Sequence, residues 1–251
     1  MKKLYVAGIG PGGMDDMTIR AEKALADSEV IVGYTPYLDL VQDRFPDKTY
    51  AGTPMGGELK RVRMALETAA GGKTTSLICS GDAGIYGMAG PALVLAADFP
   101  DVEVIILPGV TAASGAAALL GAPLMNDFCV ISLSDDLTPW QMIENRLKAA
   151  AAGDFVMALY NPKSAHRPDN LKKAVQILLA AGLPESTPCG LAGRIGRTGQ
   201  WRKLSTLAAL PGEEKIDMFT TVVIGNSQTK TAGGRLVTSR GYLSKTEGAK
   251  G

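Results

Sequence analysis

The feature that most constrains the fold is a regular alternation of apolar runs with amphipathic stretches in the first half of the chain. Strands are predicted at residues 3–10, 29–34, 48–52, 75–81 and 102–109. Helices are predicted between them, at residues 17–28, 37–45, 57–70 and 87–99. Strands that are apolar along almost their whole length are typical of a parallel sheet covered on both faces by helices. Asp15 or Asp16 is expected to cap the first helix, because a carboxylate accepts hydrogen bonds from first-turn N–H groups.

The pattern restarts after a stretch of small residues that ends near residue 123. Strands are predicted at residues 128–136, 154–162, 189–195 and 218–226, and helices at 138–152 and 170–182. We therefore expect two α/β domains, the first largely parallel over residues 1–115 and the second mixed over residues 116–251, with a flexible tail after about residue 241. No long linker separates the halves, so the active site is expected in a cleft between the two domains.

Composition excludes several classes of protein. Of the 251 residues 46% are apolar, and 26 Lys and Arg balance 25 Asp and Glu. A net charge of +1 argues against a nucleic-acid partner. No apolar run reaches the ~18–20 residues of a membrane span, so no membrane association is expected. With three cysteines and one histidine, neither a disulfide framework nor a metal site is expected, and the composition is typical of a cytoplasmic protein.

Loops rich in small residues follow five of the predicted strands. They cover residues 8–13, 80–87, 108–115, 160–164 and 193–199. A parallel sheet binds ligands outside the carboxyl ends of its strands, and small residues let backbone groups approach a ligand closely. The loops together therefore predict a ligand site, although each loop alone is weak evidence.

Two nucleotide-binding patterns match only in part. GIGPGG at residues 8–13 fits the dinucleotide fingerprint, so a nicotinamide-dependent oxidoreductase is one interpretation. Pro11 stiffens that loop, however, and the second strand ends in Gly33–Tyr34 rather than in an acid. GGKTT at residues 71–75 lacks the earlier glycine of a Walker A loop. An uncharged or cationic adenosine-type ligand therefore fits better than a nucleotide polyphosphate.

Several blocks of sequence resemble the S-adenosylmethionine-dependent tetrapyrrole methyltransferases. The general blocks are GIGPGG with MTIRAEKAL, SGDAGIYG and PGVTAASGAAALLGAPL. The blocks VGYTPYLDLV, GGELKRV, SLSDDLTPWQMIENRLKAA, FVMALYNPKS and FTTVVIGNSQT are similar to the branch that methylates C17 of precorrin-3B or cobalt-precorrin-3. The resemblance extends to about Ser227. It implies the two-domain methylase fold, C17 methylation with ring contraction to precorrin-4 or cobalt-precorrin-4, and a homodimer.

The resemblance also implies which residues contact the methyl donor. They are Pro11, Ser80, Gly81, Asp82, Ile85, Thr111, Ala112, Asn161, Ile195, Thr220 and Thr221. Asn161 falls where relatives often have methionine, and Ile195 departs from the Arg–Asn pair that many relatives keep. Asp82 is expected either to bind the methionine ammonium group or to cap a turn. Because methyl transfer is an in-line displacement, positioning and desolvation supply much of the catalysis and no strong base is required.

The substrate that the resemblance implies is a macrocycle with many carboxylates, which pair well with guanidinium groups. Loop cations near predicted strand ends are therefore candidate substrate ligands, namely Lys163, Arg167, Arg194 and Arg197. Cations on predicted helices are expected on a solvated face instead, namely Lys60, Arg61, Lys172 and Lys173.

Ring contraction requires proton movement. His166 titrates near neutral pH when unperturbed and lies in the loop after YNPKS, so it is the candidate acid or base, although a lone loop histidine is more often a plain surface residue. Tyr86, Ser132 and Asp135 are weaker candidates. Other interpretations stay open: a methylase acting on uroporphyrinogen, on C11 or in the diphthamide pathway, and a non-catalytic nucleoside-binding module. The sequence also leaves open whether the acceptor carries cobalt.

Overall fold

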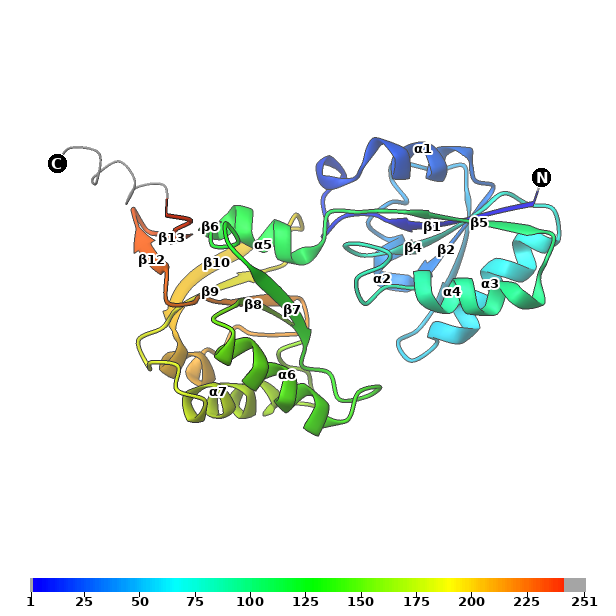
Figure 1. Cartoon of the computed structure of the whole chain (residues 1–251). Coiled ribbons are helices and arrows are strands. Elements are labelled where there is room, and N and C mark those ends of the chain that lie inside the picture. The colour runs from blue at the N-terminus through cyan, green and yellow to red at the C-terminus, as the bar shows by residue number, and fades with distance from the viewer. Residues whose placement is uncertain (1, 242–251) are drawn as a thin grey trace. The chain divides into compact units, whose positions relative to one another are not determined.

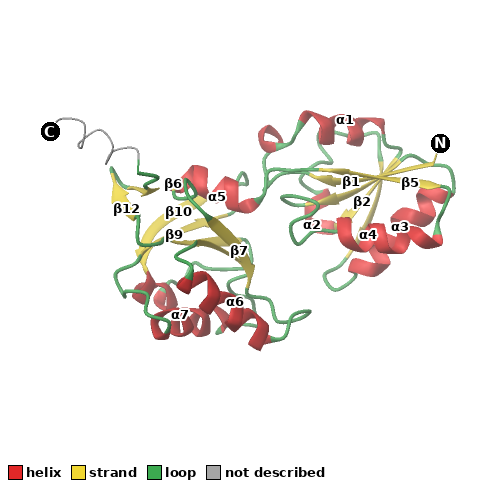
Figure 2. Ribbon diagram, in the orientation of Figure 1, coloured by secondary structure: helices red, strands yellow, loops and turns green. Residues whose placement is uncertain are grey.

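The computed structural model describes residues 2–241, which form two compact units (Figures 1 and 2). The first unit ends at Ala112 and the second begins at Ala113, close to the boundary expected after residue 115. The tail expected after residue 241 lies outside the described residues. No helix within residues 2–241 is both long and apolar enough to cross a lipid bilayer.

The first unit is built on a five-stranded sheet in which every pairing is parallel. Its strands are β1 (Lys2–Gly8), β2 (Val30–Tyr34), β3 (Thr49–Thr53), β4 (Thr75–Cys79) and β5 (Val102–Leu107). Their order across the sheet is β3-β2-β4-β1-β5. Gly8 at the end of β1 pairs with Cys79 at the end of β4, and Ala7 pairs with Leu107 at the end of β5. The loops that follow these three strands therefore start side by side.

Helices cover both faces of this sheet because its strands alternate their side chains between two apolar clusters. The helices are α1 (Ile19–Asp27), α2 (Thr35–Leu38), α3 (Glu58–Ala70) and α4 (Ala89–Leu95), with 3-10 turns η1 (Met14–Asp16) and η2 (Ala96–Asp98). Leu4 and Val6 pack with α3 and α4, whereas Ala7 packs with α1. Figure 1 shows α1 on one side of the strands and α3 and α4 on the other. The predicted parallel sheet is confirmed.

Two local predictions in this unit are wrong. Thr18, not Asp15 or Asp16, caps α1, because its hydroxyl accepts a hydrogen bond from the Ala21 N–H (3.2 Å) while both aspartates lie in the preceding η1 turn. The helix predicted over residues 37–45 is regular only within α2, and the chain continues from Asp39 in turns.

The second unit holds a mixed five-stranded sheet. Its strands are β7 (Phe128–Ser132), β8 (Val156–Tyr160), β9 (Pro188–Gly193), β10 (Trp201–Thr206) and β11 (Thr220–Ile224), in the order β10-β9-β11-β8-β7. Only β7 and β8 pair in parallel, and the other neighbours are antiparallel. The predicted mixed α/β character of the second half is confirmed.

The two faces of this second sheet are covered differently. Helices α6 (Trp140–Ala152) and α7 (Asn170–Ala180) and the turn η3 (Leu207–Gly212) enclose one apolar cluster. On the other face lies Leu120, the last residue of α5 (Ala112–Leu120), with a small sheet of β6 (Gly121–Ala122), β12 (Thr229–Ala232) and β13 (Arg235–Thr238). A Cβ on Gly190 would lie 2.7 Å from the Leu120 side chain, so a small residue in β9 is required for this close packing.

Candidate functional site

A topological switch point lies at the carboxyl edge of the first unit's sheet. The chain leaves β1 toward α1 on one face, and it leaves the neighbouring strand β4 toward α4 on the other face. A crevice opens at such a point because the two connections diverge, and parallel α/β sheets bind ligands there. The loops after β1, β4 and β5 border this edge.

Glycine backbones join the three loops closely. Gly10 and Gly81 exchange two backbone hydrogen bonds, with Gly81 N to Gly10 O at 2.7 Å and Gly10 N to Gly81 O at 3.1 Å. A Cβ on Gly109 would lie 2.2 Å from the Gly81 carbonyl oxygen, and one on Gly8 would lie 2.7 Å from the Gly109 nitrogen. No larger residue fits at Gly8 or Gly109 without moving these loops, so both glycines are required for the loops to pack this closely.

Asp82 ties two of the loops together. Its Oδ1 accepts hydrogen bonds from the N–H groups of Gly84 (2.7 Å) and Ile85 (3.1 Å), and its Oδ2 accepts one from the Gly109 N–H (2.9 Å). The first two bonds form the turn cap that the sequence offered as one role for this residue. The third bond, which the sequence did not predict, fixes the loop after β5 against the loop after β4.

The structure brings the predicted donor-binding residues of the first unit to this edge. Pro11 follows β1, Ser80, Gly81, Asp82 and Ile85 follow β4, and Thr111 and Ala112 follow β5. Cys79 lies directly behind them, where its Sγ accepts a hydrogen bond from the Met88 N–H (3.3 Å). Burial raises the pKa of the Cys79 thiol to about 11, so the group is neutral at physiological pH and is no nucleophile.

The predicted residues of the second unit lie at one end of its sheet. Strand pairing sets Ser132 beside Tyr160 and Gly193 beside Thr220. Asn161, in a left-handed conformation (φ 52°), donates from Nδ2 to the Ser132 hydroxyl (2.9 Å). The Tyr160 hydroxyl accepts a hydrogen bond from the Ala113 N–H (2.6 Å). The sequence did not single out Tyr160, although a tyrosine that ends an otherwise apolar strand is a detectable signal.

Three other predicted donor contacts in this unit are buried. Thr220 and Thr221 are 2% and 4% exposed, and Ile195 is 6% exposed. The Thr220 hydroxyl donates to Asp217 Oδ1 (3.0 Å) and accepts from the Asp217 N–H (3.1 Å). That hydroxyl therefore stabilises the turn that leads into β11.

Of the predicted substrate ligands, two arginines contact one aromatic ring. The guanidinium carbons of Arg194 and Arg197 lie 5.7 and 5.2 Å from the centroid of the Phe219 ring. Arg194 also lies 3.8 Å from an Asp217 carboxylate oxygen. The end of this sheet therefore carries two guanidinium groups beside one aromatic ring, with the Asp217 carboxylate offsetting part of their charge.

The loop after β8 carries the remaining candidates. Arg167 forms an ion pair with Asp136, and His166 is exposed in the turn before it. Lys163 is partly buried in the same loop. Among the helical cations, Lys60, Lys172 and Lys173 are exposed as predicted. The prediction for Arg61 is wrong, because this side chain is buried and donates to the Thr53 hydroxyl (2.8 Å) and to the Pro54 carbonyl (3.1 Å).

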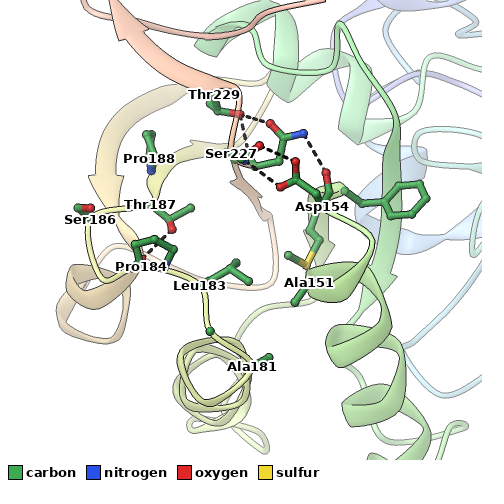
Figure 3. Close-up of a pocket in the computed structure, with 15 residues that line it drawn as sticks. Ala151, Asp154, Ala181, Leu183, Pro184, Ser186, Thr187, Pro188, Ser227 and Thr229 are labelled. Atoms are coloured by element: carbon green, nitrogen blue, oxygen red, sulfur yellow. Dashed lines mark hydrogen bonds between the residues drawn. The ribbon is translucent and has the colours of Figure 1, made fainter.

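A hollow of about 370 Å³ lies at the opposite end of the second unit's sheet (Figure 3). Residues at the start of β8 and β9 and at the end of β11 line this hollow, and none of the predicted site residues is among them. Its acidic side chain, Asp154, accepts hydrogen bonds from the Ser227 N–H (2.9 Å) and hydroxyl (2.6 Å). The carboxylate therefore stabilises the loop after β11, and we do not assign the site to this hollow. Within residues 2–241 no three His, Cys, Asp or Glu side chains gather into a metal-binding group.

Comparison with known proteins assigns most of the chain to one family. Residues 3–211 match the family described as Tetrapyrrole (Corrin/Porphyrin) Methylases. A probable cobalt-factor III C(17)-methyltransferase of Salmonella typhimurium is 47% identical over 240 residues, which are 95% of this chain and 99% of that protein. A precorrin-3B C(17)-methyltransferase of a Sinorhizobium species is 40% identical over 240 residues, 90% of each chain.

A solved structure shows the same architecture. The crystal structure of the methyltransferase CobJ superposes with a TM-score of 0.87 at 38% identity, covering 94% of this chain and 99% of that one. The predicted two-domain α/β fold and the predicted methyltransferase class are confirmed, and the interpretation as a nicotinamide-dependent oxidoreductase is dropped. The chain belongs to the tetrapyrrole (corrin/porphyrin) methylases.

Proposed function

We propose that this methyltransferase acts in cobalamin biosynthesis, where it methylates C17 of precorrin-3B or of its cobalt-bearing counterpart and contracts the macrocycle. The observation that carries the proposal is similarity from end to end. The Salmonella relative named for this reaction matches 95% of this chain and is itself matched over 99% of its length. The blocks of sequence similar to the C17 branch lie in both halves of the chain, which supports the same assignment.

The methyl donor in this proposal is S-adenosylmethionine, held at the carboxyl edge of the first unit's sheet. The fit is supported by the close packing of the loops after β1, β4 and β5, where a side chain at Gly8 or Gly109 would collide with the backbone of a neighbouring loop. The donor supplies a methyl group on a positively charged sulfur. Backbone carbonyls and neutral polar groups such as Ser80 and Thr111 hold such a cation without reacting with it. The residues therefore contribute position and exclusion of water, which are the main requirements of an in-line displacement. The cleft expected between the two units stays a prediction.

The acceptor in this proposal is recognised through its acetate and propionate groups. Arg194 and Arg197 carry guanidinium groups that lie beside the Phe219 ring, and Lys163 lies in the loop after β8. The planar guanidinium group can pair with a carboxylate through two parallel hydrogen bonds. We assign these cations, with Arg167, to the acceptor.

His166 is proposed to move the proton that ring contraction requires. Its exposed position in the turn of the loop after β8 leaves the imidazole accessible to an acceptor and to solvent. Imidazole exchanges protons readily near neutral pH. By resemblance to the family we further propose a homodimer and a cytoplasmic location, and sedimentation of the purified protein at twice the chain mass would support the dimer.

The proposed reaction is tested by product mass spectrometry. The protein is incubated without oxygen with S-adenosylmethionine carrying a trideuterated methyl group and, in parallel, with precorrin-3B, cobalt-factor III or uroporphyrinogen III. We expect one labelled methyl group in the product of one of the first two acceptors, and the preferred acceptor identifies the metal-free or cobalt-bearing route. Label entering uroporphyrinogen III instead would show that the enzyme methylates a different acceptor at a position other than C17. Label entering no tetrapyrrole would overturn the proposal.

A further inference from the structure

Two buried polar atoms in the loop after β8 have no hydrogen-bond partner. They are the Ser164 hydroxyl oxygen and the Arg167 Nε, and no other side-chain oxygen or nitrogen within residues 2–241 shares this condition. Leaving a buried donor unsatisfied is costly. In native structures such groups are completed by ordered water or by a bound ligand. The loop also carries Lys163, assigned above to the acceptor, and His166, assigned above to proton transfer.

Backbone pairing places the two side chains together. Ser164 N donates to Arg167 O (3.2 Å) and Arg167 N donates to Ser164 O (3.1 Å), so the two residues form an antiparallel bridge. Residues that face each other in such a bridge extend their side chains from the same side, with Cβ atoms about 5 Å apart. The hydroxyl and the guanidinium Nε therefore belong to one small group of donors.

Arg167 is already paired with a carboxylate through a different nitrogen. Its Nη1 forms an ion pair with Asp136 Oδ2, in the loop after β7, and the Ser134 hydroxyl lies 3.3 Å from the same oxygen. The hydrogen bond from Arg167 lowers the pKa of the Asp136 carboxyl below its usual value. The Asp136 side chain is 67% exposed, whereas that of Arg167 is 19% exposed. The arginine is thus held in the loop, while its carboxylate partner lies largely in solvent.

The two donors match the chemistry of a two-oxygen acceptor. A carboxylate can accept from Arg167 Nε–H with one oxygen and from the Ser164 hydroxyl with the other, which satisfies both donors at once. An incoming carboxylate would compete with Asp136 for the Arg167 guanidinium, and the Asp136 side chain, which is 67% exposed, can turn into solvent.

We propose that Ser164 and Arg167 form a binding subsite for one carboxylate of the acidic tetrapyrrole, and that Asp136 occupies Arg167 while the subsite is empty. The inference rests on the proposed function for the identity of the ligand. It adds a residue, Ser164, that the sequence did not single out. It also assigns a role to Asp136, whose carboxylate competes with the carboxylate of the tetrapyrrole for Arg167.

The test measures the dissociation constant of anaerobically prepared cobalt-factor III, without methyl donor, by absorbance titration. Ser164→Ala is expected to raise it about 5- to 10-fold, and Arg167→Lys by at least as much. Asp136→Asn is expected to lower it about 3-fold, because the competitor is gone. Ser186→Ala and Arg146→Lys are matched controls on other surfaces of the second unit and should leave it unchanged. The dissociation constant of S-adenosylhomocysteine should be the same in every variant.

The sign of the Asp136→Asn effect decides the inference. If the Arg167–Asp136 pair merely supports the loop, this variant binds the tetrapyrrole more weakly, and the proposal is overturned. Unchanged affinity in Ser164→Ala overturns it as well. A wild-type protein that binds cobalt-factor III but transfers no methyl group contradicts the proposed function alone, because the subsite is read from binding and not from turnover.

Discussion

Gly109 lies so close to Gly81 that a Cβ added to Gly109 would stand 2.2 Å from the Gly81 carbonyl oxygen. Gly109→Ala must therefore push apart the loops after β4 and β5. We expect a loss of about 1–3 kcal/mol in the free energy of unfolding, typical of overpacking. We also expect at least 10-fold weaker binding of S-adenosylhomocysteine, measured by calorimetry.

Gly90→Ala is the matched control for this substitution. Gly90 lies in α4, and a Cβ there would have no heavy atom within 4 Å. Because Gly90 precedes Pro91, whose ring crowds a Cβ on the residue before it, alanine should bring no gain in stability here, but the variant should keep full affinity because α4 lies outside these loops. Equal affinity of wild type and Gly109→Ala would show that the close approach of the loops does not matter for the donor.

Asp82→Asn tests the bond between the same two loops. The asparagine oxygen can still accept from Gly84 and Ile85, but its NH₂ group cannot accept from the Gly109 N–H. Because hydrogen bonds to charged groups contribute about 1.5–3 kcal/mol, we expect a loss of that order in urea unfolding and weaker binding of the donor product. Asp98→Asn, which removes an exposed partner of Arg63, should change stability by less than about 1 kcal/mol. Equal losses in the two variants would contradict the role of Asp82.

Much of the fold could be predicted from the sequence because apolar periodicity reports burial. The buried strands of the first unit, such as β2, are apolar along most of their length and are predicted at the correct places. Helix α5 could not be recognised, because its run of alanine, glycine and leucine has no polar face to show a helical period. The β12–β13 hairpin was missed, although Gly233–Gly234 between two short runs is a typical hairpin turn and both glycines have positive φ.

The candidate site was predictable to the level of loops but not of contacts. Gly8–Gly13 and Ser80–Gly87 could be assigned to one edge because they follow strands of a parallel sheet. The bond from Gly109 to Asp82 joins residues 27 positions apart, and no local pattern specifies it. The burial of Arg61 was unpredictable for the same reason, since its partners Thr53 and Pro54 lie outside its helix.

His166→Ala tests the proton role assigned to the loop after β8. His166 is exposed, so its removal should leave stability and the affinity for S-adenosylhomocysteine unchanged. General acid–base catalysis contributes typically about 10²–10⁴-fold, and we expect ring contraction to slow by about 100-fold while methyl transfer continues. Single-turnover absorbance spectra distinguish the methylated macrocycle before and after contraction. His166→Asn, which cannot titrate, should behave as alanine does, and normal contraction in both variants would remove His166 from the mechanism.

The buried thiols predict a loss of stability at high pH. Burial raises the pKa of Cys79 to about 11 and that of Cys189 to about 12 from an ordinary value of 9.0. The unfolded chain therefore ionises these thiols first, so their contribution is complete below pH 9 and is lost as the pH rises toward 11–12. Between pH 8 and 10 the free energy of unfolding should fall in both proteins. We expect the decrease in Cys189→Ala to be smaller than the decrease in wild type by about 1 kcal/mol. Parallel losses in urea titrations of the two proteins would contradict the raised pKa of Cys189.

Binding of the adenosine methyl donor at the glycine-rich edge of the first unit is checked by calorimetric titration of the wild-type protein with S-adenosylhomocysteine and, separately, with NADH. We expect saturable binding of S-adenosylhomocysteine at one site per chain, weakened in Gly109→Ala, and no binding of NADH. Tight binding of NADH without binding of S-adenosylhomocysteine would show that this edge does not hold the methyl donor.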